Sequence, residues 1–251
     1  MLQFLSIFLA LYLLAGLFLY IKQRDILYFP TTENQTANAE VLWLKTSTGK
    51  LKIWKFHQGN PAIIYFGGNS EQVEDNIVDF KNMFRDFSVY VVNYRGYGGS
   101  SGSPTEKGLF QDALEIYDQI SPQHSSVSVI GRSLGSGVAS YLAAHREIFR
   151  LVLITPYDSI RNVAQSHYPL FPVKWLIKDR FDSIIYAPLI KSKILVLYAE
   201  FDQMVPWAHT KNLLNFLPDA TSQLIEGATH NDITVNPQYQ KLLTEFINST
   251  E

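Results

Sequence analysis

The stretch Gly131-Arg132-Ser133-Leu134-Gly135 decides the fold, because it joins an apolar run at 127–130 to a small-residue helical stretch at 136–145. A Gly-x-Ser-x-Gly sequence between a strand and a helix is the pattern of a nucleophile elbow. The serine of such a turn has a strained backbone conformation, which only small neighbouring residues tolerate. We expect Gly131 and Gly135 to supply that room, so that the Ser133 hydroxyl projects into the open. A plain Gly/Ser turn is the alternative.

Apolar strands alternate with amphipathic helices on both sides of this turn. Two of the strands, 41–45 and 51–56, are separated by a Ser-Thr-Gly turn and should form an antiparallel hairpin. The other expected strands are 61–66, 88–93, 127–130, 151–155, 194–199 and 223–225, and the expected helices are 71–84, 106–120, 136–145, 210–216 and 237–248. This alternation predicts an α/β fold with a mostly parallel central sheet covered by helices on both faces.

Composition narrows the class of protein. The chain has 251 residues, enough for one large domain with a substantial core. Its net charge is -2 and 18% of its residues are charged, so no basic field indicates a nucleic-acid partner. The sequence contains no cysteine, which excludes a thiol nucleophile, a thiolate zinc site and disulfides.

The first 21 residues carry no charged side chain and predict a membrane anchor. As a helix they would be about 31 Å long, close to the roughly 30 Å thickness of the hydrocarbon layer. A cleaved signal peptide is the alternative, but a basic start and a small-residue cleavage site are not evident. Lys22 and Arg24 follow the span, so the positive-inside rule favours the cytoplasmic side for the rest of the chain, although Asp25 lies beside them.

A serine hydroxyl needs a base, and a histidine base needs an acid that orients it. Of the six histidines, His230 alone lies on a loop after the last expected strand, where reactive groups of parallel sheets gather. His167 is the rival, and His209, which opens a helix, is expected to be a surface residue. For the acid, Asp202 follows the strand at 194–199; Glu200 and Asp158 are the alternatives.

The fourth part of the expected site is an oxyanion hole made of two backbone N–H groups. One should come from Leu134, the residue after the serine. The other should come from the glycine-containing loop after the strand at 61–66, and we assign it to Asn69, with Gly68 as the alternative. A simple Gly-Gly-Asn turn would explain the loop equally.

Several stretches of the sequence together resemble the α/β-hydrolase serine hydrolases, in particular their branch with a single N-terminal membrane span. The stretches are 26–30, 65–70, 93–100, the elbow, 156–159, 178–182 and 229–233, so the resemblance covers nearly the whole chain beyond the span. It implies the α/β-hydrolase fold and acyl-transfer chemistry, and the order Ser133, Asp202, His230 is the order of that fold. Relatives usually carry His-Gly-Asn in the oxyanion loop, whereas this chain has Gly67 in place of the histidine.

The sequence therefore predicts an anchor at 1–21, a tether at 22–40 and a catalytic domain at 41–251, with a small cap at 157–188. The cap is rich in aromatic residues, which either contact an acyl chain or pack into the core. A further ambiguity concerns Arg132, which pairs either with a nearby carboxylate or with an anionic group of the substrate.

The predicted function is that of a membrane-anchored serine hydrolase that cleaves a lipid-like or acyl-protein ester or thioester through a Ser-His-Asp triad and an acyl-enzyme. No metal or organic cofactor is implied. A serine peptidase or amidase of the same fold and a catalytically silent membrane-bound binding protein are the alternatives.

Overall fold

The computed structural model describes residues 2–34, 39–217 and 219–249. The remaining positions of the predicted anchor, tether and catalytic domain (1, 35–38, 218 and 250–251) lie outside the described residues. Within the described ranges, eight strands form one sheet in the order β1-β2-β4-β3-β5-β6-β7-β8. The strands are β1 (Glu40–Thr46), β2 (Gly49–Phe56), β3 (Ala62–Phe66), β4 (Ser88–Val92), β5 (Val127–Arg132), β6 (Arg150–Ile154), β7 (Lys193–Ala199) and β8 (Thr221–Ile225).

The sheet is mostly parallel, as the sequence predicts. All neighbours from β4 through β3 to β8 pair in parallel. At one end, β2 pairs antiparallel with both β1 and β4, so the predicted hairpin is confirmed. The α-helices are α1 (Leu2–Leu27), α2 (Ile77–Met83), α3 (Glu106–Ile120), α4 (Leu134–His145), α5 (Ile160–His167), α6 (Val173–Leu176), α7 (Ser183–Tyr186), α8 (Trp207–Leu214) and α9 (Pro237–Asn248).

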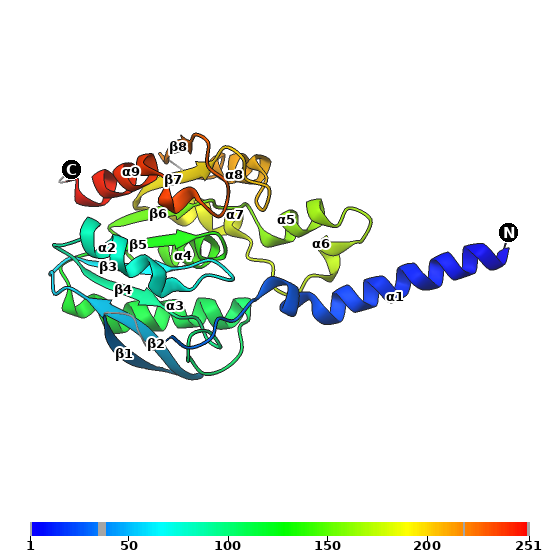
Figure 1. Cartoon of the computed structure of the whole chain (residues 1–251), viewed down its shortest axis with the longest axis horizontal. Coiled ribbons are helices and arrows are strands. Elements are labelled where there is room, and N and C mark those ends of the chain that lie inside the picture. Colours follow the sequence, from blue (N-terminus) through cyan, green and yellow to red (C-terminus); the bar gives the residue numbers. More distant parts are fainter. Residues whose placement is uncertain (1, 35–38, 218, 250–251) are drawn as a thin grey trace.

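Two hydrophobic cores lie on the two faces of the sheet. In the buried strand β3, Ile64 packs with side chains of α3, α4 and α8, whereas Ile63 and Tyr65 pack with side chains of α2 and α9. This alternation follows from the period of two in a strand. Helices therefore cover both faces, as predicted, and Figure 1 shows the resulting layers.

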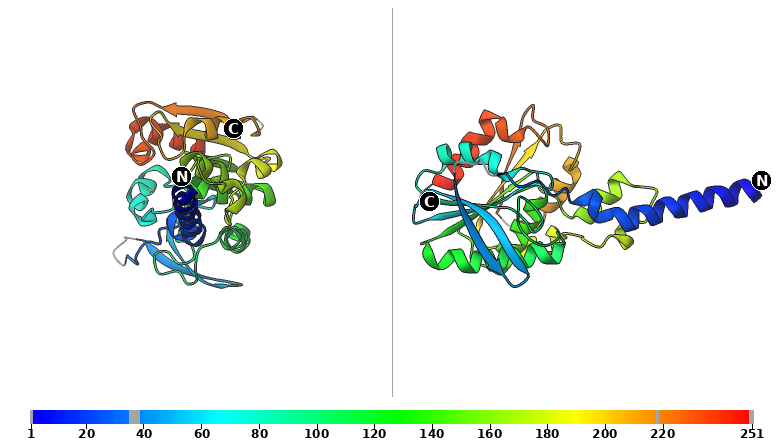
Figure 2. Two further views of the ribbon diagram at one scale, coloured as in Figure 1. Left: turned by 90° about the vertical axis from the view of Figure 1, so that its right-hand side faces the viewer. Right: turned by 60° about the horizontal axis from the view of Figure 1, so that its bottom comes forward.

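Helix α1 projects from the domain, with its N-terminal end far from the sheet (Figure 2). It is apolar and long enough to cross a membrane, and none of its most apolar window is buried inside the protein. The helix continues to Leu27, six residues beyond the predicted end of the anchor. The part of the predicted tether that follows contacts the domain, because Tyr28 is buried and the Phe29 N–H donates to the carbonyl of Asn69 at 3.2 Å.

The predicted cap at 157–188 consists of α5, α6 and α7 with their connections. Its second half belongs to the core: Phe181 is fully buried, and Tyr186 packs against Phe110. Its first half protrudes beside α1, with Trp175 largely exposed and Phe171 stacked on an aromatic residue of α1. Core packing therefore holds for the aromatic residues of the second half, whereas an acyl-chain contact of the first half stays a prediction.

Candidate active site

Ser133 lies on a sharp turn between β5 and α4, at the carboxyl ends of the parallel strands. Its backbone angles, φ 50° and ψ −118°, are in a region that L-residues rarely adopt. Side chains are excluded at the two flanking glycines: a β-carbon on Gly131 would collide with the carbonyl of Gly135, and one on Gly135 would collide with that of Phe66. The expected strained elbow is therefore present, and its glycines are required by close packing.

The structure brings Ser133, His230 and Asp202 together. The Ser133 Oγ lies 2.9 Å from His230 Nε2, and His230 Nδ1 lies 2.7 Å from Asp202 Oδ2. A carboxylate oxygen can only accept, so Nδ1 carries the proton and Nε2 is free to accept the hydroxyl proton of the serine. The side chains of His230 and Asp202 are 10% and 6% exposed, so their contact is shielded from water.

The loop that carries Asp202 fixes the orientation of its carboxylate. The second oxygen of Asp202 accepts hydrogen bonds from the N–H groups of Met204 at 3.0 Å and Val205 at 2.7 Å. Both carboxylate oxygens therefore have fixed partners, and the orientation of the imidazole is fixed in turn. Glu200, the sequence alternative, instead accepts from the Gly227 N–H at 2.8 Å.

The loop after β3 lies against the nucleophile. A β-carbon on Gly68 would be 3.6 Å from that of Ser133. The Gly68 N–H donates to Glu71 at 2.6 Å, so this alternative donor is already occupied. For the N–H groups of Asn69 and Leu134, the described part of the chain offers no hydrogen-bond acceptor, so both are available to a substrate oxygen.

Glu71, whose side chain is 9% exposed, is the carboxylate that organises this loop. Its Oε1 accepts from the Tyr65 hydroxyl at 2.6 Å and from Asn76 at 2.7 Å. Its Oε2 accepts from Gly68 and lies 3.1 Å from a guanidinium nitrogen of Arg132, whose side chain is 13% exposed. Of the two alternatives for Arg132, the structure shows pairing with a carboxylate.

Arg132 extends this network to the histidine loop. Its other terminal nitrogen donates to the carbonyls of His230 at 3.2 Å and Asn231 at 3.3 Å. Burial is the largest single effect and lowers the pKa of Arg132, but the charge and hydrogen bond of Glu71 together with Tyr65 and Tyr239 outweigh burial and raise the pKa above its ordinary value. The Glu71–Arg132 ion pair thus connects three segments: the loop after β3, the turn at Ser133 and the loop that carries His230. Sequence reasoning missed Glu71, although a charged residue inside a buried elbow was a signal that a carboxylate lies nearby.

The other histidine candidates are not brought to Ser133. The His167 ring contacts the carbonyl of Met204 at 2.9 Å, which connects the cap to the acid loop. The expectation of a surface role for His209 is wrong: its side chain is 13% exposed and lies 3.0 Å from Asp158, the second alternative acid. Burial of Asp158 requires donors around it, and His209 is one of them.

Ser166, His209 and Asp158 form a second Ser-His-Asp arrangement, because the Ser166 hydroxyl lies 3.0 Å from the other ring nitrogen of His209. However, Ser166 lies within α5, and its hydroxyl also donates to the Val163 carbonyl at 2.8 Å. Ser166 is solvent-exposed, but it lies inside a regular helix and not on a strained strand-to-helix turn such as that of Ser133. The contact of Ser166, His209 and Asp158 links α5 to α8, and Ser133 remains the better candidate for the nucleophile.

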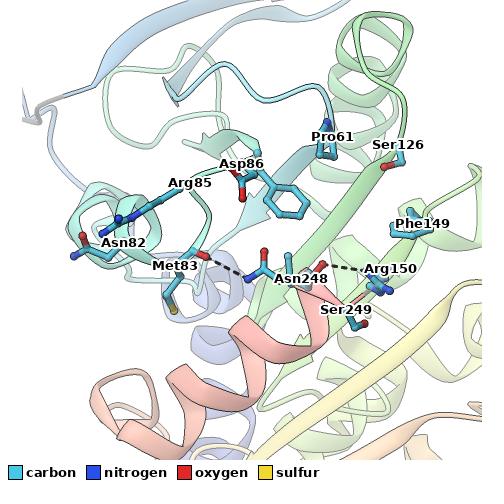
Figure 3. A pocket seen from close by; sticks show the side chains of 12 residues that line it. Pro61, Asn82, Met83, Arg85, Asp86, Ser126, Phe149, Arg150, Asn248 and Ser249 are labelled. Carbon is cyan, nitrogen blue, oxygen red and sulfur yellow. Dashed lines mark hydrogen bonds between the residues drawn. The ribbon is translucent and has the colours of Figure 1, made fainter. Parts of the chain in front are cut away.

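A hollow lies at the opposite edge of the sheet (Figure 3). Pro61, Ser126 and Arg150, at the beginnings of β3, β5 and β6, line it. Arg150 donates to the carbonyl of Ile247 at 3.0 Å, which fastens the end of α9 there. The described lining contains none of the residues around Ser133, so the hollow is separate from the candidate site. Within the described ranges, no group of three His, Asp or Glu side chains could hold a metal ion.

No protein-family model matches the sequence. The chain is 31% identical over 247 residues to the lysophosphatidylserine lipase ABHD12 of Bos taurus, covering 84% of this chain and 62% of that protein. It is 29% identical over 235 residues to the uncharacterized protein Rv2307c of Mycobacterium tuberculosis, covering 86% of this chain and 83% of that protein. The chain thus spans less than two thirds of the bovine lipase.

Solved structures share the fold at low sequence identity. An esterase from Exiguobacterium antarcticum aligns with a TM-score of 0.68 at 16% identity, covering 84% of this chain and 100% of that one. The esterase Pf2001 of Pyrococcus furiosus also aligns with a TM-score of 0.68, at 17% identity, covering 88% and 97%. An enol-lactonase from Burkholderia xenovorans aligns with a TM-score of 0.66 at 14% identity, covering 83% and 100%. These likenesses confirm the predicted α/β-hydrolase fold.

Proposed function

The chain belongs to the α/β-hydrolase superfamily of serine ester hydrolases, and on that premise we propose that it is a membrane-anchored hydrolase of lipid-like carboxylic esters. The observation that carries the proposal is the chain of hydrogen bonds from Ser133 through His230 to Asp202. In this proposal Ser133 is the nucleophile, His230 the general base and acid, and Asp202 the residue that orients the histidine.

The reaction follows from these positions. The Ser133 oxygen attacks the acyl carbonyl while His230 Nε2 takes its proton, and the resulting imidazolium is stabilised by Asp202. The oxyanion accepts hydrogen bonds from the Asn69 and Leu134 N–H groups. His230 then protonates the leaving alcohol, which departs and leaves the acyl-enzyme. Water, deprotonated by the same histidine, attacks the acyl-enzyme and releases the carboxylic acid.

Glu71 and Arg132 are positioning residues in this proposal. Glu71 holds Gly68, the residue before the proposed donor Asn69, through a 2.6 Å hydrogen bond. Arg132, the residue before the nucleophile, holds the carbonyl of His230. Because oxyanion donors act only when aimed at the position of the developing charge, small displacements of these loops cost rate.

The substrate class follows from the anchor and from the relatives. The bovine relative's name describes a lipase of lysophosphatidylserine, a single-chain phospholipid ester. A helix fit to cross a membrane holds Ser133 near a bilayer surface, where such esters reside. Ester hydrolysis is therefore proposed ahead of thioester or amide hydrolysis. Lys22 and Arg24, which follow the span, favour the cytoplasmic side for the catalytic domain.

The test uses the purified full-length chain in detergent and a serine-reactive fluorophosphonate probe. Wild type should be labelled and Ser133→Ala should not. Ser166→Ala is the matched control, because it removes the serine of the second Ser-His-Asp arrangement; it should be labelled like wild type. Labelling that persists in Ser133→Ala would refute the assignment.

Substrate class is tested with an oleoyl lysophospholipid, an oleoyl thioester and an aminoacyl amide. The lysophospholipid should be hydrolysed fastest, and only by variants that retain Ser133. Faster cleavage of the amide would replace the proposal with a peptidase or amidase. A wild-type chain that neither labels nor hydrolyses any of the three would be a catalytically silent fold.

A further inference from the structure

The part of the cap that reaches furthest along α1 is residues 168–176, here called the cap hairpin. The rings of Tyr12 and Phe171 are stacked, with centroids 5.0 Å apart and an interplanar angle of 3°. The Tyr12 hydroxyl donates to the carbonyl of Leu170 at 2.8 Å. Gly16 also lies beside the Phe171 ring, since a β-carbon there would be 3.6 Å from the ring, an ordinary van der Waals distance. In Figures 1 and 2 the cap extends beside α1 in the same way.

Polar and aromatic contacts join α1 to the cap at the base of the hairpin. The Lys178 N–H donates to Gln23 at 2.6 Å, and its ammonium lies 4.5 Å from the centre of the Tyr20 ring. Arg24 pairs with Asp179 at 2.7 Å. Tyrosine, lysine and arginine are enriched where a span meets water. The membrane surface is therefore expected near residues 20–24 of α1.

The position of Tyr12 in α1 determines the depth of the hairpin. The apolar segment fit to cross a membrane covers Gln3–Leu27. Tyr12 precedes Tyr20 by eight residues, which is about 12 Å along the helix at 1.5 Å per residue. If α1 spans and the membrane surface lies near residues 20–24, Tyr12 lies inside the roughly 30 Å hydrocarbon layer, and the hairpin packed on Tyr12 lies within it as well.

The outward face of the hairpin suits this depth. Leu170 and Trp175 are 80% and 84% exposed, although both are large and apolar. The hairpin has no acidic residue, and its single charged side chain, Lys174, is long enough to extend its ammonium toward the headgroups. Such a surface is costly in water and stable in acyl chains.

Most backbone N–H groups of the hairpin, though not that of Leu170, have acceptors among the described residues, as a medium without water favours. Pro169 and Pro172 have no N–H. The Gln165 side chain donates to the carbonyls of Tyr168 and Phe171 at 3.2 and 3.0 Å, and it accepts from the Lys174 N–H at 3.2 Å. Further N–H groups bonded to carbonyls of the cap are those of Tyr168, Phe171, Val173 and Trp175.

We propose that the cap hairpin is a second membrane-embedded element, which enters one leaflet beside α1 and contacts lipid acyl chains through Leu170 and Trp175. The inference rests on the proposed span of α1. The hairpin directly follows His167, the last residue of α5, and the His167 ring contacts the carbonyl of Met204 at 2.9 Å. The embedded element is thus connected to the loop that carries Asp202.

The absence of cysteine from the sequence makes the test direct. Single cysteines are introduced into the full-length chain as Leu170→Cys, Trp175→Cys, Leu13→Cys and Val78→Cys, and each is labelled with the fluorophore NBD. The proteins are reconstituted in phosphatidylcholine vesicles with and without doxyl-labelled lipid, and quenching by lipid and by aqueous iodide is measured. Val78 is the water control because it is 69% exposed on α2, and Leu13 reports on the span.

The expected result is that positions 170 and 175 behave like position 13, with blue-shifted emission, strong doxyl quenching and iodide quenching several-fold weaker than at position 78. Water exposure at 170 and 175 with lipid burial at 13 would overturn the inference and leave the anchor intact. Water exposure at 13 as well would refute the span, and with it both the anchor and the embedded hairpin.

Discussion

The side-chain amide of Asn69 donates to the carbonyl of Leu27, the last residue of α1, at 2.9 Å. On the other side of the same residue, the Asn69 carbonyl accepts from the Tyr97 hydroxyl at 2.7 Å and from the Phe29 N–H. The end of the proposed anchor is therefore part of the support of the proposed oxyanion donor. Since Glu71 holds Gly68 from within the domain, the loop is held from two sides.

We predict that Asn69→Ala lowers kcat by up to about tenfold with little change in KM, because the loss of one hydrogen bond costs roughly 0.5–1.5 kcal/mol. The backbone N–H remains, but the loop that aims it loses its contact with Leu27. Steady-state kinetics on a short soluble ester measure the effect. Gln72→Ala is the matched control, since Gln72 bonds only peripherally, to Thr32 at 3.5 Å and Glu74 at 3.2 Å. An unchanged kcat in Asn69→Ala would show that the hydrogen bond from Asn69 to Leu27 does not support catalysis.

Asp202→Asn should lower kcat by about 10⁴-fold without unfolding the protein. The N–H groups of Met204 and Val205 force the amide oxygen toward themselves, so the amide NH₂ faces His230 Nδ1. The imidazole must then carry its proton on Nε2, where it cannot accept the proton of Ser133. The pre-steady-state rate of acylation by a chromogenic ester measures the loss. Glu200→Gln, which alters the neighbouring carboxylate, should stay within about twofold of wild type; equal losses in both would contradict the assignment of the acid.

Glu71→Gln should reduce both stability and rate. It leaves the Arg132 charge buried without its partner, which costs roughly 3–5 kcal/mol of unfolding free energy. In the variant, the NH₂ group of the glutamine also faces hydrogen-bond donors that bond to the Glu71 carboxylate in wild type. Urea unfolding in detergent and kcat are the measurements.

A second variant separates the charge from the geometry. Adding Arg132→Met to Glu71→Gln removes the uncompensated cation and should recover part of the stability, while kcat stays low. Recovery of full activity in the double variant would show that the ion pair has no positioning role.

Whether a feature of the fold or of the candidate site could be predicted from the sequence depends on how far apart in the chain the interacting residues are. Helix α3 begins at Glu106 and ends at Ile120, as its periodicity predicts, because the signal is local. Strand order likewise predicts that Asp202 and His230 lie near Ser133, since the carboxyl ends of parallel strands meet at one edge. In contrast, the role of Glu71 and the burial of His209 arise from contacts between loops far apart in the chain, which no local pattern encodes.

The acid stability of the domain should depend on Asp158. Burial alone would raise the pKa of this carboxyl, but hydrogen bonds from His209 and two asparagines outweigh burial and lower the pKa below its ordinary value of 3.8. A depressed folded-state pKa contributes stability above the unfolded value, and this contribution is lost as pH falls through the folded value. The loss should therefore appear below about pH 3.8.

Asp158→Asn removes this titration. The variant should be less stable than wild type at pH 6, and the difference should shrink as the pH falls below 3.8. Chemical unfolding at a series of pH values measures both curves. Asp25→Asn, at an exposed position of α1, is the control and should run parallel to wild type. A difference between wild type and Asp158→Asn that is constant with pH would contradict the prediction.

Gly67 occupies the position at which relatives usually carry histidine, and its surroundings explain the difference. A β-carbon at this position would lie 2.6 Å from a methyl group of Val73, and Val73 is buried in the core beneath the loop. Gly67→Ala should therefore cost roughly 1–3 kcal/mol by overpacking. Val73→Ala creates the missing space, so in the double variant the cost of Gly67→Ala should largely disappear. A double-mutant cycle on the unfolding free energy measures this coupling, which should be at least about 1 kcal/mol. Simple additivity of the two changes would mean that the loop shifts to accept a side chain, and that Val73 does not determine the residue at position 67.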